Sequence, residues 1–254
     1  MLIDTHAHLY AKDFAHDRDK MVRNAIQSGV QKIILPNIDE NSIESMLELS
    51  SAYPDVCFPL MGLHPTSVGE NYKEQLKTVE SWIGKMVFFG IGETGIDLYW
   101  DKTYHKEQEI AFRIQLQMAR SLNKPVVIHV RNSFNEVYQI LMEEQDGNLF
   151  GVFHCFSGSV AEAQKIIEIG FSIGIGGVVT FKNSNLPEIL RQVDIKHIVL
   201  ETDAPYLAPM PYRGRRNESA FLLHIAEKVA DIYGIEIGEI SRKTSENAQM
   251  LFGI

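Results

Sequence analysis

Cysteine is scarce in this sequence: among 254 residues, only Cys57 and Cys155 are present. Two cysteines cannot form the framework of disulfides that stabilises small secreted domains, so we expect a protein of the reducing cytoplasm, although one bridge between them is compatible with the sequence. The first ten residues carry Asp4, His6 and His8 in place of an apolar stretch, so we expect no secretory signal. No uninterrupted apolar run approaches the roughly 18 residues that span a bilayer, and we expect no membrane partner.

Basic residues are also in the minority. Lysine and arginine number 24 against 33 aspartates and glutamates, which gives a formal net charge of −9. This balance argues against a protein held to nucleic acid by a broad basic surface. It does not exclude an enzyme that contacts phosphate locally, because bound divalent metals invert the charge of a small cleft. With 45% hydrophobic and 22% charged residues, the composition excludes extensive disorder.

Short apolar segments alternate with longer amphipathic ones along the whole chain. Apolar residues recur at helical spacing within 39–51, 111–122 and 222–233. This alternation predicts βαβ units and a parallel sheet. Eight expected strands are short and rich in β-branched or aromatic residues, as buried parallel strands are. They are Leu2–Asp4, Lys32–Pro36, Val56–Met61, Val87–Ile91, Pro125–His129, Gly151–His154, Phe171–Ile175 and His197–Glu201.

Eight strand–helix units in 254 residues suit a (β/α)₈ TIM barrel. No stretch rich in proline, glycine or serine is long enough to mark a domain boundary, so we expect residues 1–254 to form a single domain. A doubly wound open sheet is the alternative, and periodicity does not separate the two. Because a barrel of this size buries its own core, we expect a monomer.

The first motif with chemical meaning follows the first expected strand, in Asp4-Thr5-His6-Ala7-His8. Histidines at i and i+2 on an extended strand project to the same face, where two imidazoles can chelate one divalent ion. A lone H-x-H pair is about as often simply hydrogen-bonded. Here the pair ends a strand, where a barrel has its active site, and this position favours metal ligands.

Residue types that bind metals recur at the ends of the fourth, fifth, sixth and eighth expected strands, as Glu93, His129, His154 and Asp203. Any one of them is more often structural, but closure of a barrel would bring them into one mouth together with the histidine pair. Four histidines and two carboxylates exceed one tetrahedral zinc site and suit two divalent ions. We expect Zn²⁺, Mn²⁺ or Mg²⁺, and the nitrogen ligands argue against Ca²⁺.

Each of these residues has an expected role. One ion is held by His6, His8 and Asp203, the other by His129 and His154, and Glu93 bridges them. Asp203 is also placed to accept the proton of an attacking water, so Asp203 and Glu93 are the expected catalytic residues. Glu201 either orients a ligand or forms a structural ion pair. His64 ends the third expected strand, where we expect it to contact substrate, with a structural role as the alternative.

Five segments of the chain resemble the TatD family of metal-dependent deoxyribonucleases, which lies within the amidohydrolase-like TIM barrels. They are Asp4–Leu9, Gly92–Asp97, Pro125–His129, His154–Gly158 and Leu200–Pro209 with its continuation Arg213–Glu218. The resemblance runs the whole length and implies metal ligands at the same six positions. Thr94 stands where the family often has an aliphatic residue, and His129-Val130-Arg131-Asn132-Ser133 replaces an H-S-R-D-A-like run. Neither departure removes a ligand.

The resemblance implies a deoxyribonuclease that acts as a 3′→5′ exonuclease on single-stranded ends, in DNA repair or degradation. The expected nucleophile is a water activated by the metals. Related barrels hydrolyse esters and amides, and some relatives deacylate mischarged tRNA. A metal-dependent ester or amide hydrolase, such as a D-aminoacyl-tRNA deacylase, is therefore the alternative. A nucleic-acid-binding module without activity is a third hypothesis, against which the net charge and the ligand set both argue.

Phosphate requires cationic contacts, and arginine suits it because the planar guanidinium binds two oxygens at once. We expect Arg131 to contact substrate, together with the loop residues Arg213, Arg215 and Arg216. The alternative for the loop is that some of its arginines hold it in place through ion pairs. Ser157 is expected either to donate to phosphate or to cap the next helix.

Three aromatic residues, Tyr99, Trp100 and Tyr206, are expected on loops at the mouth of the barrel. An aromatic face there can stack an unpaired base, although packing within the loop is the more common role. A deep mouth favours strand ends or single strands over intact duplex.

Overall fold

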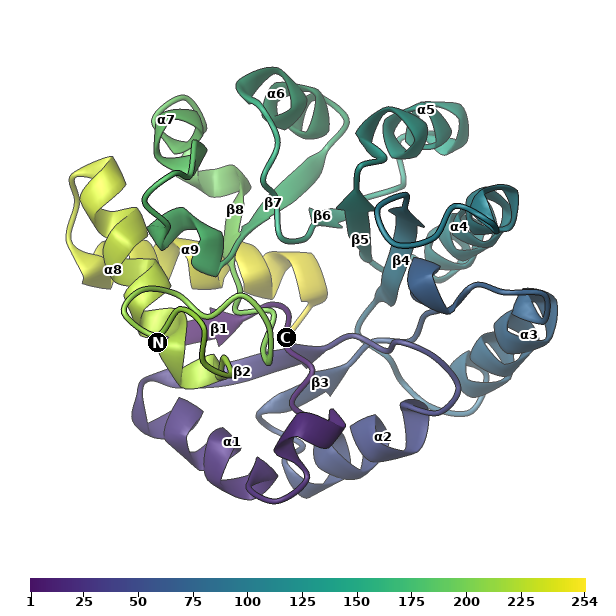
Figure 1. Cartoon of the computed structure of the whole chain (residues 1–254), viewed down its shortest axis with the longest axis horizontal. Coiled ribbons are helices and arrows are strands. Elements are labelled where there is room, and N and C mark those ends of the chain that lie inside the picture. The colour runs from purple at the N-terminus through teal and green to yellow at the C-terminus, as the bar shows by residue number, and fades with distance from the viewer.

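The computed structural model describes residues 1–254 and contains eight strands that pair in parallel, each followed by a helical segment (Figure 1). The strands are β1 (Leu2–Asp4), β2 (Val30–Leu35), β3 (Cys57–Pro59), β4 (Ile91–Asp97), β5 (Val126–Arg131), β6 (Gly151–Phe153), β7 (Phe171–Ile175) and β8 (Ile198–Leu200). The helices are α1 (Arg18–Gln27), α2 (Ile43–Ala52), α3 (Tyr72–Ile83), α4 (His105–Leu122), α5 (Phe134–Glu144), α6 (Val160–Glu168), α7 (Leu186–Leu190), α8 (Leu222–Tyr233) and α9 (Ile237–Phe252). The strands surround a common centre and the helices lie outside them (Figure 1).

Backbone hydrogen bonds close the barrel at two seams between the sheet β1-β2-β3 and the sheet β4-β5-β6-β7-β8. At one seam Met61 N donates to Gly90 O (3.2 Å) and Gly92 N donates to Met61 O (3.0 Å). At the other seam Thr5 N donates to Leu200 O (3.0 Å), which joins β1 to β8. This closure confirms the prediction of a (β/α)₈ TIM barrel, and the doubly wound alternative is wrong.

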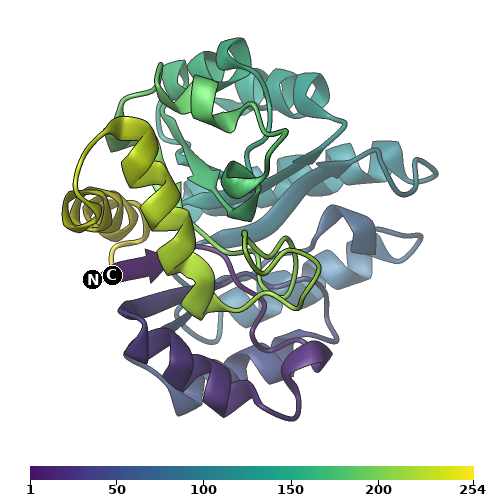
Figure 2. The same ribbon diagram turned by 60° about the vertical axis from the view of Figure 1, so that its left-hand side comes forward.

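Apolar side chains form one layer between strands and helices and a second layer inside the barrel. The inner cluster consists of Ile3, Ile34, Phe58, Leu60, Val127, Val152, Val199, Ala248 and Phe252. Its last two members lie on α9, so this helix seals the amino-terminal end of the barrel. Both chain ends lie at that same end (Figure 2), where Ser245 Oγ donates to Met1 O (3.1 Å). Polar side chains instead occupy the carboxyl end of the barrel, where the loops follow the strands.

The fourth strand lies later than the hydrophobic pattern predicts. The pattern places it at Val87–Ile91, whereas β4 spans Ile91–Asp97 and Val87 is 70% exposed. Glycines explain the difference, because they allow β4 to approach β5 so closely that a Cβ on Gly92 would lie 2.8 Å from Val127 Cβ. A strand that contains glycines and polar residues carries little hydrophobic signal. The other seven strands agree with the prediction to within two residues at each end.

The three expected helices are all present. The segment 222–233 coincides with α8, and the segment 111–122 is the latter part of α4, which begins at His105. The segment 39–51 forms a helix only from Ile43 onward, because Asp39 Oδ1 accepts the backbone N–H of Asn41 (2.9 Å) and of Ser42 (3.1 Å) in a turn. None of the helices is long and apolar enough to span a membrane.

Truncation of Phe252 tests the sealing role of α9. Phe252 is 3% exposed within the inner cluster, so we expect Phe252→Ala to leave a cavity and to lower the free energy of unfolding by about 3–5 kcal/mol. Met250 lies on the same helix but is 75% exposed, so the control Met250→Ala should change that free energy by about 0.5 kcal/mol or less. Urea denaturation followed by circular dichroism measures both variants. Similar losses in the two would show that α9 does not seal the barrel.

Candidate metal centre

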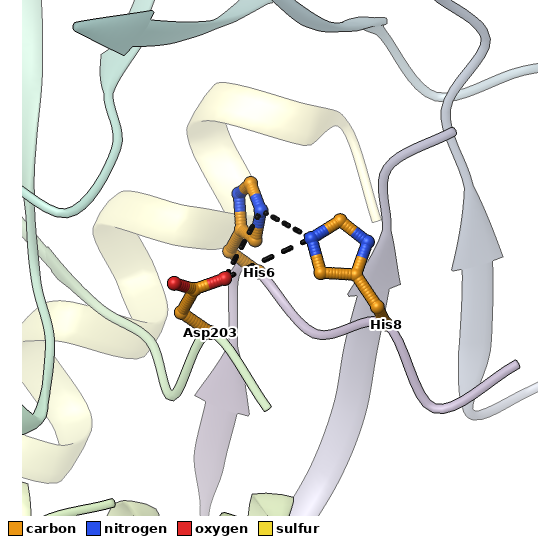
Figure 3. Close-up of side chains that lie close together, drawn as sticks. All are labelled: His6, His8 and Asp203. Atoms are coloured by element: carbon orange, nitrogen blue, oxygen red, sulfur yellow. Dashed lines mark hydrogen bonds and ion pairs between the residues drawn. The ribbon is translucent and has the colours of Figure 1, made fainter. Parts of the chain in front are cut away.

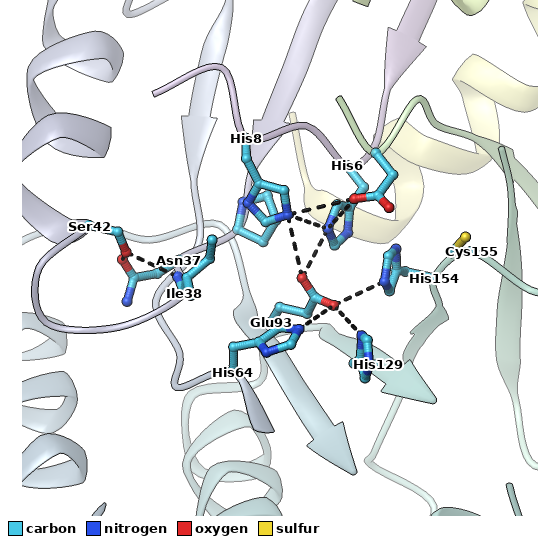
Figure 4. Close-up of polar contacts among 12 residues, drawn as sticks. His6, His8, Asn37, Ile38, Ser42, His64, Glu93, His129, His154 and Cys155 are labelled. Carbon is cyan, nitrogen blue, oxygen red and sulfur yellow. Dashed lines mark hydrogen bonds and ion pairs between the residues drawn. The ribbon is translucent and has the colours of Figure 1, made fainter. Parts of the chain in front are cut away.

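Six side chains meet at the carboxyl end of the barrel (Figures 3 and 4). They are His6 and His8 after β1, Glu93 in β4, His129 in β5, His154 after β6 and Asp203 after β8. The structure thus brings together all six residues that the sequence suggested as metal ligands. Glu93 and His129 lie within their strands and do not follow them, because β4 and β5 continue to pair through Asp97 and Arg131.

His6, His8 and Asp203 form the first candidate ion site (Figure 3). His6 Nε2 lies 3.1 Å from His8 Nε2 and 3.8 Å from Asp203 Oδ1. His8 Nε2 lies 3.7 Å from the same oxygen. Ligand atoms at roughly 2.0–2.2 Å from one tetrahedral ion are about 3.3–3.6 Å apart. All three distances lie within about 0.2 Å of this range, so the atoms are spaced nearly as the ligands of a single ion would be.

Glu93 lies between two groups of histidines (Figure 4). Its Oε2 is 3.1 Å from His6 Nε2 and 3.6 Å from His8 Nε2. Its Oε1 is 2.8 Å from His129 Nδ1 and 2.9 Å from His154 Nε2. The side chain is 2% exposed. Each carboxylate oxygen thus faces a different pair of the expected metal ligands.

Contacts on the far side of two rings determine which nitrogen faces the centre. The Tyr10 hydroxyl donates to Pro36 O, so it accepts a hydrogen bond from His8 Nδ1, which lies 2.9 Å away. Burial lowers the pKa of His8 to about 4, so the neutral ring directs the lone pair of Nε2 into the cluster. His154 Nδ1 lies 3.4 Å from Glu201 Oε1, so a carboxylate flanks the outer side of that ring as well. Outer partners of this kind are typical of histidines that bind metals.

Asp97 holds His129 in a similar way. Asp97 Oδ2 lies 3.0 Å from His129 Nε2, and Oδ1 accepts the backbone N–H of Tyr99 (2.9 Å) and of Trp100 (3.2 Å). Burial by itself raises the pKa of Asp97, but these hydrogen bonds outweigh it and lower the pKa to about 2. The ionised carboxylate accepts a hydrogen bond from His129 Nε2, and Nδ1 faces Glu93.

Tyr10 and Asp97 are supporting residues that the motif search missed. Tyr10 is two residues after His8, and Asp97 is four residues after Glu93. Glu93 and Asp97 both lie on β4, where side chains alternate between faces, so the two share a face and this alternation would have found Asp97. Tyr10 lies in a turn after His8, where no strand alternation indicates its position.

His64 faces the centre with a protonated nitrogen, whereas His8 faces it with a lone pair. It precedes the short helical turn Pro65–Ser67, and its Nδ1 accepts the backbone N–H of Thr66 (3.1 Å). The neutral ring therefore carries its proton on Nε2, which lies 3.3 Å from Glu93 Oε1. In this tautomer His64 donates a hydrogen bond into the centre and offers no lone pair to an ion. The geometry fits the expected contact with substrate.

The electrostatics of the centre favour a cation. Burial raises the pKa of Glu93, but His154 and His64 outweigh it and lower the pKa well below its usual range. Burial alone would lower the pKa of His154, but Glu93 and Glu201 raise it well above its usual value. Burial also raises the pKa of Asp203 to about 7. A buried group of carboxylates and imidazoles in this state attracts positive charge, whether a proton or a divalent metal. The residues present therefore fit a metal centre.

Glu201 supports the end of β6 from inside the barrel. The side chain is fully buried, and its Oε1 accepts the backbone N–H of Cys155, next to His154. Gly174 on β7 provides the space, because a Cβ at this position would overlap the Glu201 carboxylate. The buried Glu201 carboxylate thus fits both interpretations, because it can orient His154 and also hold the end of β6 in place.

The arginines expected at the rim differ in their partners. Arg216 forms an ion pair with Asp17 (2.6 Å), so it fits the alternative in which an ion pair holds the loop. Arg131, Arg213 and Arg215 are exposed and form no ion pair. These three are therefore available to an anionic ligand, and Arg216 is already engaged.

Ser157 lies beside a cavity of about 370 Å³ that His154 also lines. The residue that caps α6 is Ser159, whose side chain accepts the backbone N–H of Glu162 (3.3 Å). The capping alternative for Ser157 is therefore wrong. Its exposed hydroxyl is available to a ligand in the cavity.

Comparisons with known proteins agree with this geometry. A sequence model of the family described as TatD related DNase matches residues 3–253. The chain is 34% identical over 255 residues to the uncharacterized metal-dependent hydrolase YabD of Bacillus subtilis (strain 168), with all of both chains covered. It is 32% identical over 259 residues to the 3′-5′ ssDNA/RNA exonuclease TatD of Pantoea ananatis, again with full coverage of both. Among solved structures, the TatD homologue YjjV of Escherichia coli K12 superposes with a TM-score of 0.89 at 27% identity, covering 100% of this chain and 98% of that one.

Filling the space at Gly174 tests the support that Glu201 gives to the centre. We expect Gly174→Ala to displace the buried carboxylate from Cys155 and His154, and so to weaken zinc binding about 10–100-fold. The overpacking should also lower the free energy of unfolding by about 1–3 kcal/mol. A Cβ added at Gly238 on α9 would have no neighbouring atom within 4 Å, so Gly238→Ala is the matched control and should leave zinc affinity unchanged. Calorimetric zinc titration and urea denaturation provide the measurements, and equal zinc affinities in the two variants would refute the role of Glu201.

Proposed function

Because this chain belongs to the TatD-related DNase family of metal-dependent hydrolases, we propose that its metal centre hydrolyses DNA phosphodiester bonds, removing nucleotides from the 3′ ends of single strands. The family and the hydrolase class rest on the match over residues 3–253. The substrate, the strand preference and the polarity are our proposal. The relative from Pantoea ananatis is named a 3′-5′ ssDNA/RNA exonuclease, and this name supports them.

The position of Glu93 is the observation that carries this proposal. A single buried carboxylate faces His6 and His8 with one oxygen, and faces His129 and His154 with the other. This geometry supports two divalent ions, Zn²⁺, Mg²⁺ or Mn²⁺, with Glu93 between them. A pair of ions is well suited to phosphodiester hydrolysis, in which both the attacking and the leaving oxygen need stabilisation.

The protein groups around the ions have distinct tasks. When bound, the ions would lower the pKa of a water from 15.7 toward about 7 and would take up charge from the phosphate. Asp203 directs Oδ1 toward His6 and His8 and makes no hydrogen bond through Oδ2, which leaves that oxygen to accept the proton of the attacking water. His64 donates from Nε2 to a phosphate oxygen.

The distribution of positive charge supports an anionic substrate that is bound locally. The protein carries a net charge of −9, so it lacks a general attraction for nucleic acid. Three unpaired arginines, Arg131, Arg213 and Arg215, lie on the loops and strand ends at the carboxyl end of the barrel, and Ser157 adds a hydroxyl donor beside His154. We propose that these groups bind individual phosphates of a flexible strand.

End-labelled oligonucleotides test activity and polarity together. A single-stranded oligonucleotide, labelled at the 5′ end in one sample and at the 3′ end in another, is incubated with the protein and Mg²⁺, Mn²⁺ or Zn²⁺. We expect a shortening ladder from the 5′ label and immediate release of the 3′ label as mononucleotide. EDTA should abolish both, because it removes the divalent metals on which the proposed hydrolysis depends. An intact oligonucleotide with every metal would contradict the proposal and favour the alternative, which D-aminoacyl-tRNA tests under the same conditions.

Substitution of Glu93 by glutamine tests the bridging carboxylate. Glu93→Gln retains the shape of the side chain but removes the charge between the histidine groups, so we expect hydrolysis to fall by at least about 10²–10³-fold. Bound metal, measured by mass spectrometry of the purified protein, should fall as well. Glu168 is exposed and has no ion-pair partner, so Glu168→Gln is the control. A folded Glu93→Gln variant with full activity and full metal content would refute the bridge.

A further inference from the structure

Two large aromatic side chains lie exposed beside the metal centre. Trp100 is 69% exposed and Tyr99 is 53% exposed, and both follow β4 directly. Their rings meet edge to face with centroids 5.0 Å apart. Neighbouring aromatic rings in solvent contribute little to the core of their own protein and are typical of binding surfaces.

Arg131 completes this surface. Its guanidinium carbon lies 4.0 Å from the centroid of the Tyr99 ring and 5.1 Å from that of Trp100. The side chain forms no ion pair and no hydrogen bond, in contrast to Arg216, which is paired with Asp17. A guanidinium over an aromatic ring keeps the N–H groups at its edge free for phosphate oxygens. We call Tyr99, Trp100 and Arg131 the aromatic shelf.

Asp97 ties the aromatic shelf to the metal centre. One of its oxygens accepts the backbone N–H of Tyr99 and of Trp100, at 2.9 and 3.2 Å. The other oxygen lies 3.0 Å from His129 Nε2. Asp97 also pairs with Arg131 in the register of β4 and β5. The shelf is therefore held one carboxylate away from a candidate metal ligand.

A third exposed aromatic residue, Tyr206, lies across the centre from the aromatic shelf. It is 53% exposed, and its ring centroid lies 6.3 Å from that of His8. His8 follows β1, whereas the shelf lies at β4 and β5 on the opposite side of the barrel (Figure 1). A single nucleic-acid strand that crosses the metal centre would meet an aromatic ring on each side.

We propose that the aromatic shelf is a base-stacking site, which binds an unpaired nucleobase next to the phosphodiester at the metal centre while Arg131 contacts the adjoining phosphate. The inference rests on the proposed function and specifies how its substrate is held. Every nucleobase has a π face, so stacking on Trp100 tolerates any sequence. Within a duplex both faces of each base are covered by the neighbouring bases, and only the outer face of each terminal pair is open, so the shelf favours single strands.

The tryptophan content permits a direct optical test, because Trp82 and Trp100 are the only two in the chain. Trp82 lies on α3, so in the variant Trp82→Phe the fluorescence reports Trp100 alone. We expect a single-stranded oligothymidylate about ten nucleotides long, with nuclease-resistant phosphorothioate linkages, to quench this fluorescence saturably. A blunt duplex of the same length should quench it far less. Saturable binding of the single strand with no change in Trp100 fluorescence would overturn the proposal.

Two substitutions of Trp100 measure its contribution. We expect Trp100→Ala to raise the dissociation constant for the oligonucleotide about 5- to 150-fold, and Trp100→Phe to retain most of the affinity because it retains a stacking ring. The kcat/KM for a cleavable oligonucleotide should fall by a larger factor than that for bis(p-nitrophenyl) phosphate, which has no nucleobase. Trp82→Phe is the control and should bind as the unaltered protein does.

The outcomes separate the aromatic shelf from the proposed function. Equal losses on the two substrates, or unchanged oligonucleotide affinity in Trp100→Ala, would overturn the shelf and leave hydrolysis of DNA in place. Failure of the unaltered protein to cleave either substrate with any of the three metals would instead contradict the proposed function.

Discussion

The carboxyl end of this barrel is organised around one buried charge, the carboxylate of Glu93. A carboxylate that is 2% exposed is stable only when its oxygens are surrounded by donors or cations. Imidazoles from distant parts of the chain supply this environment, with one oxygen facing His6 and His8 and the other facing His129 and His154. The same requirement makes the site attractive to divalent metals. The buried charge of Glu93 therefore both needs compensation and provides the site for a catalytic metal.

Barrel closure and the first ion site depend on the same contacts. Thr202 donates to both oxygens of Asp4, from its backbone N (2.9 Å) and its hydroxyl (2.6 Å), and so links the β8 end to β1. Asp203 N donates to His6 O (2.8 Å) at the same seam. The hydrogen bonds that join the first strand to the last therefore also bring an aspartate from residue 203 next to histidines near the amino terminus. A barrel that failed to close would lose the site as well as its inner core.

Partners outside the cluster give chemically identical side chains different tasks. The Tyr10 hydroxyl accepts a hydrogen bond from His8 Nδ1, which leaves the lone pair of His8 Nε2 toward the centre. The backbone N–H of Thr66 instead keeps the proton of His64 on the nitrogen that faces Glu93. One ring is set as a ligand and the other as a donor. Asp97 extends this control outward, because it contacts His129 and also the backbone of the exposed aromatic residues.

Local patterns in the sequence predicted the strand–helix alternation, seven of the eight strands and the metal-binding residue types near the strand ends. Hydrophobic periodicity and short motifs such as His6-Ala7-His8 are properties of short segments, so they can be recognised without the fold. The tertiary structure alone decided the rest. The hydrophobic pattern predicted β4 too early in the chain. Its glycines are explained by the close approach of β5, as Gly92 beside Val127 shows, and this contact exists only in the folded protein. The tautomer of His64, the support of His154 by Glu201 and the engagement of Arg216 by Asp17 were likewise undecided. Each depends on a contact made only after folding, and for Glu201 and Arg216 the partner is distant along the chain, where no local pattern reveals it.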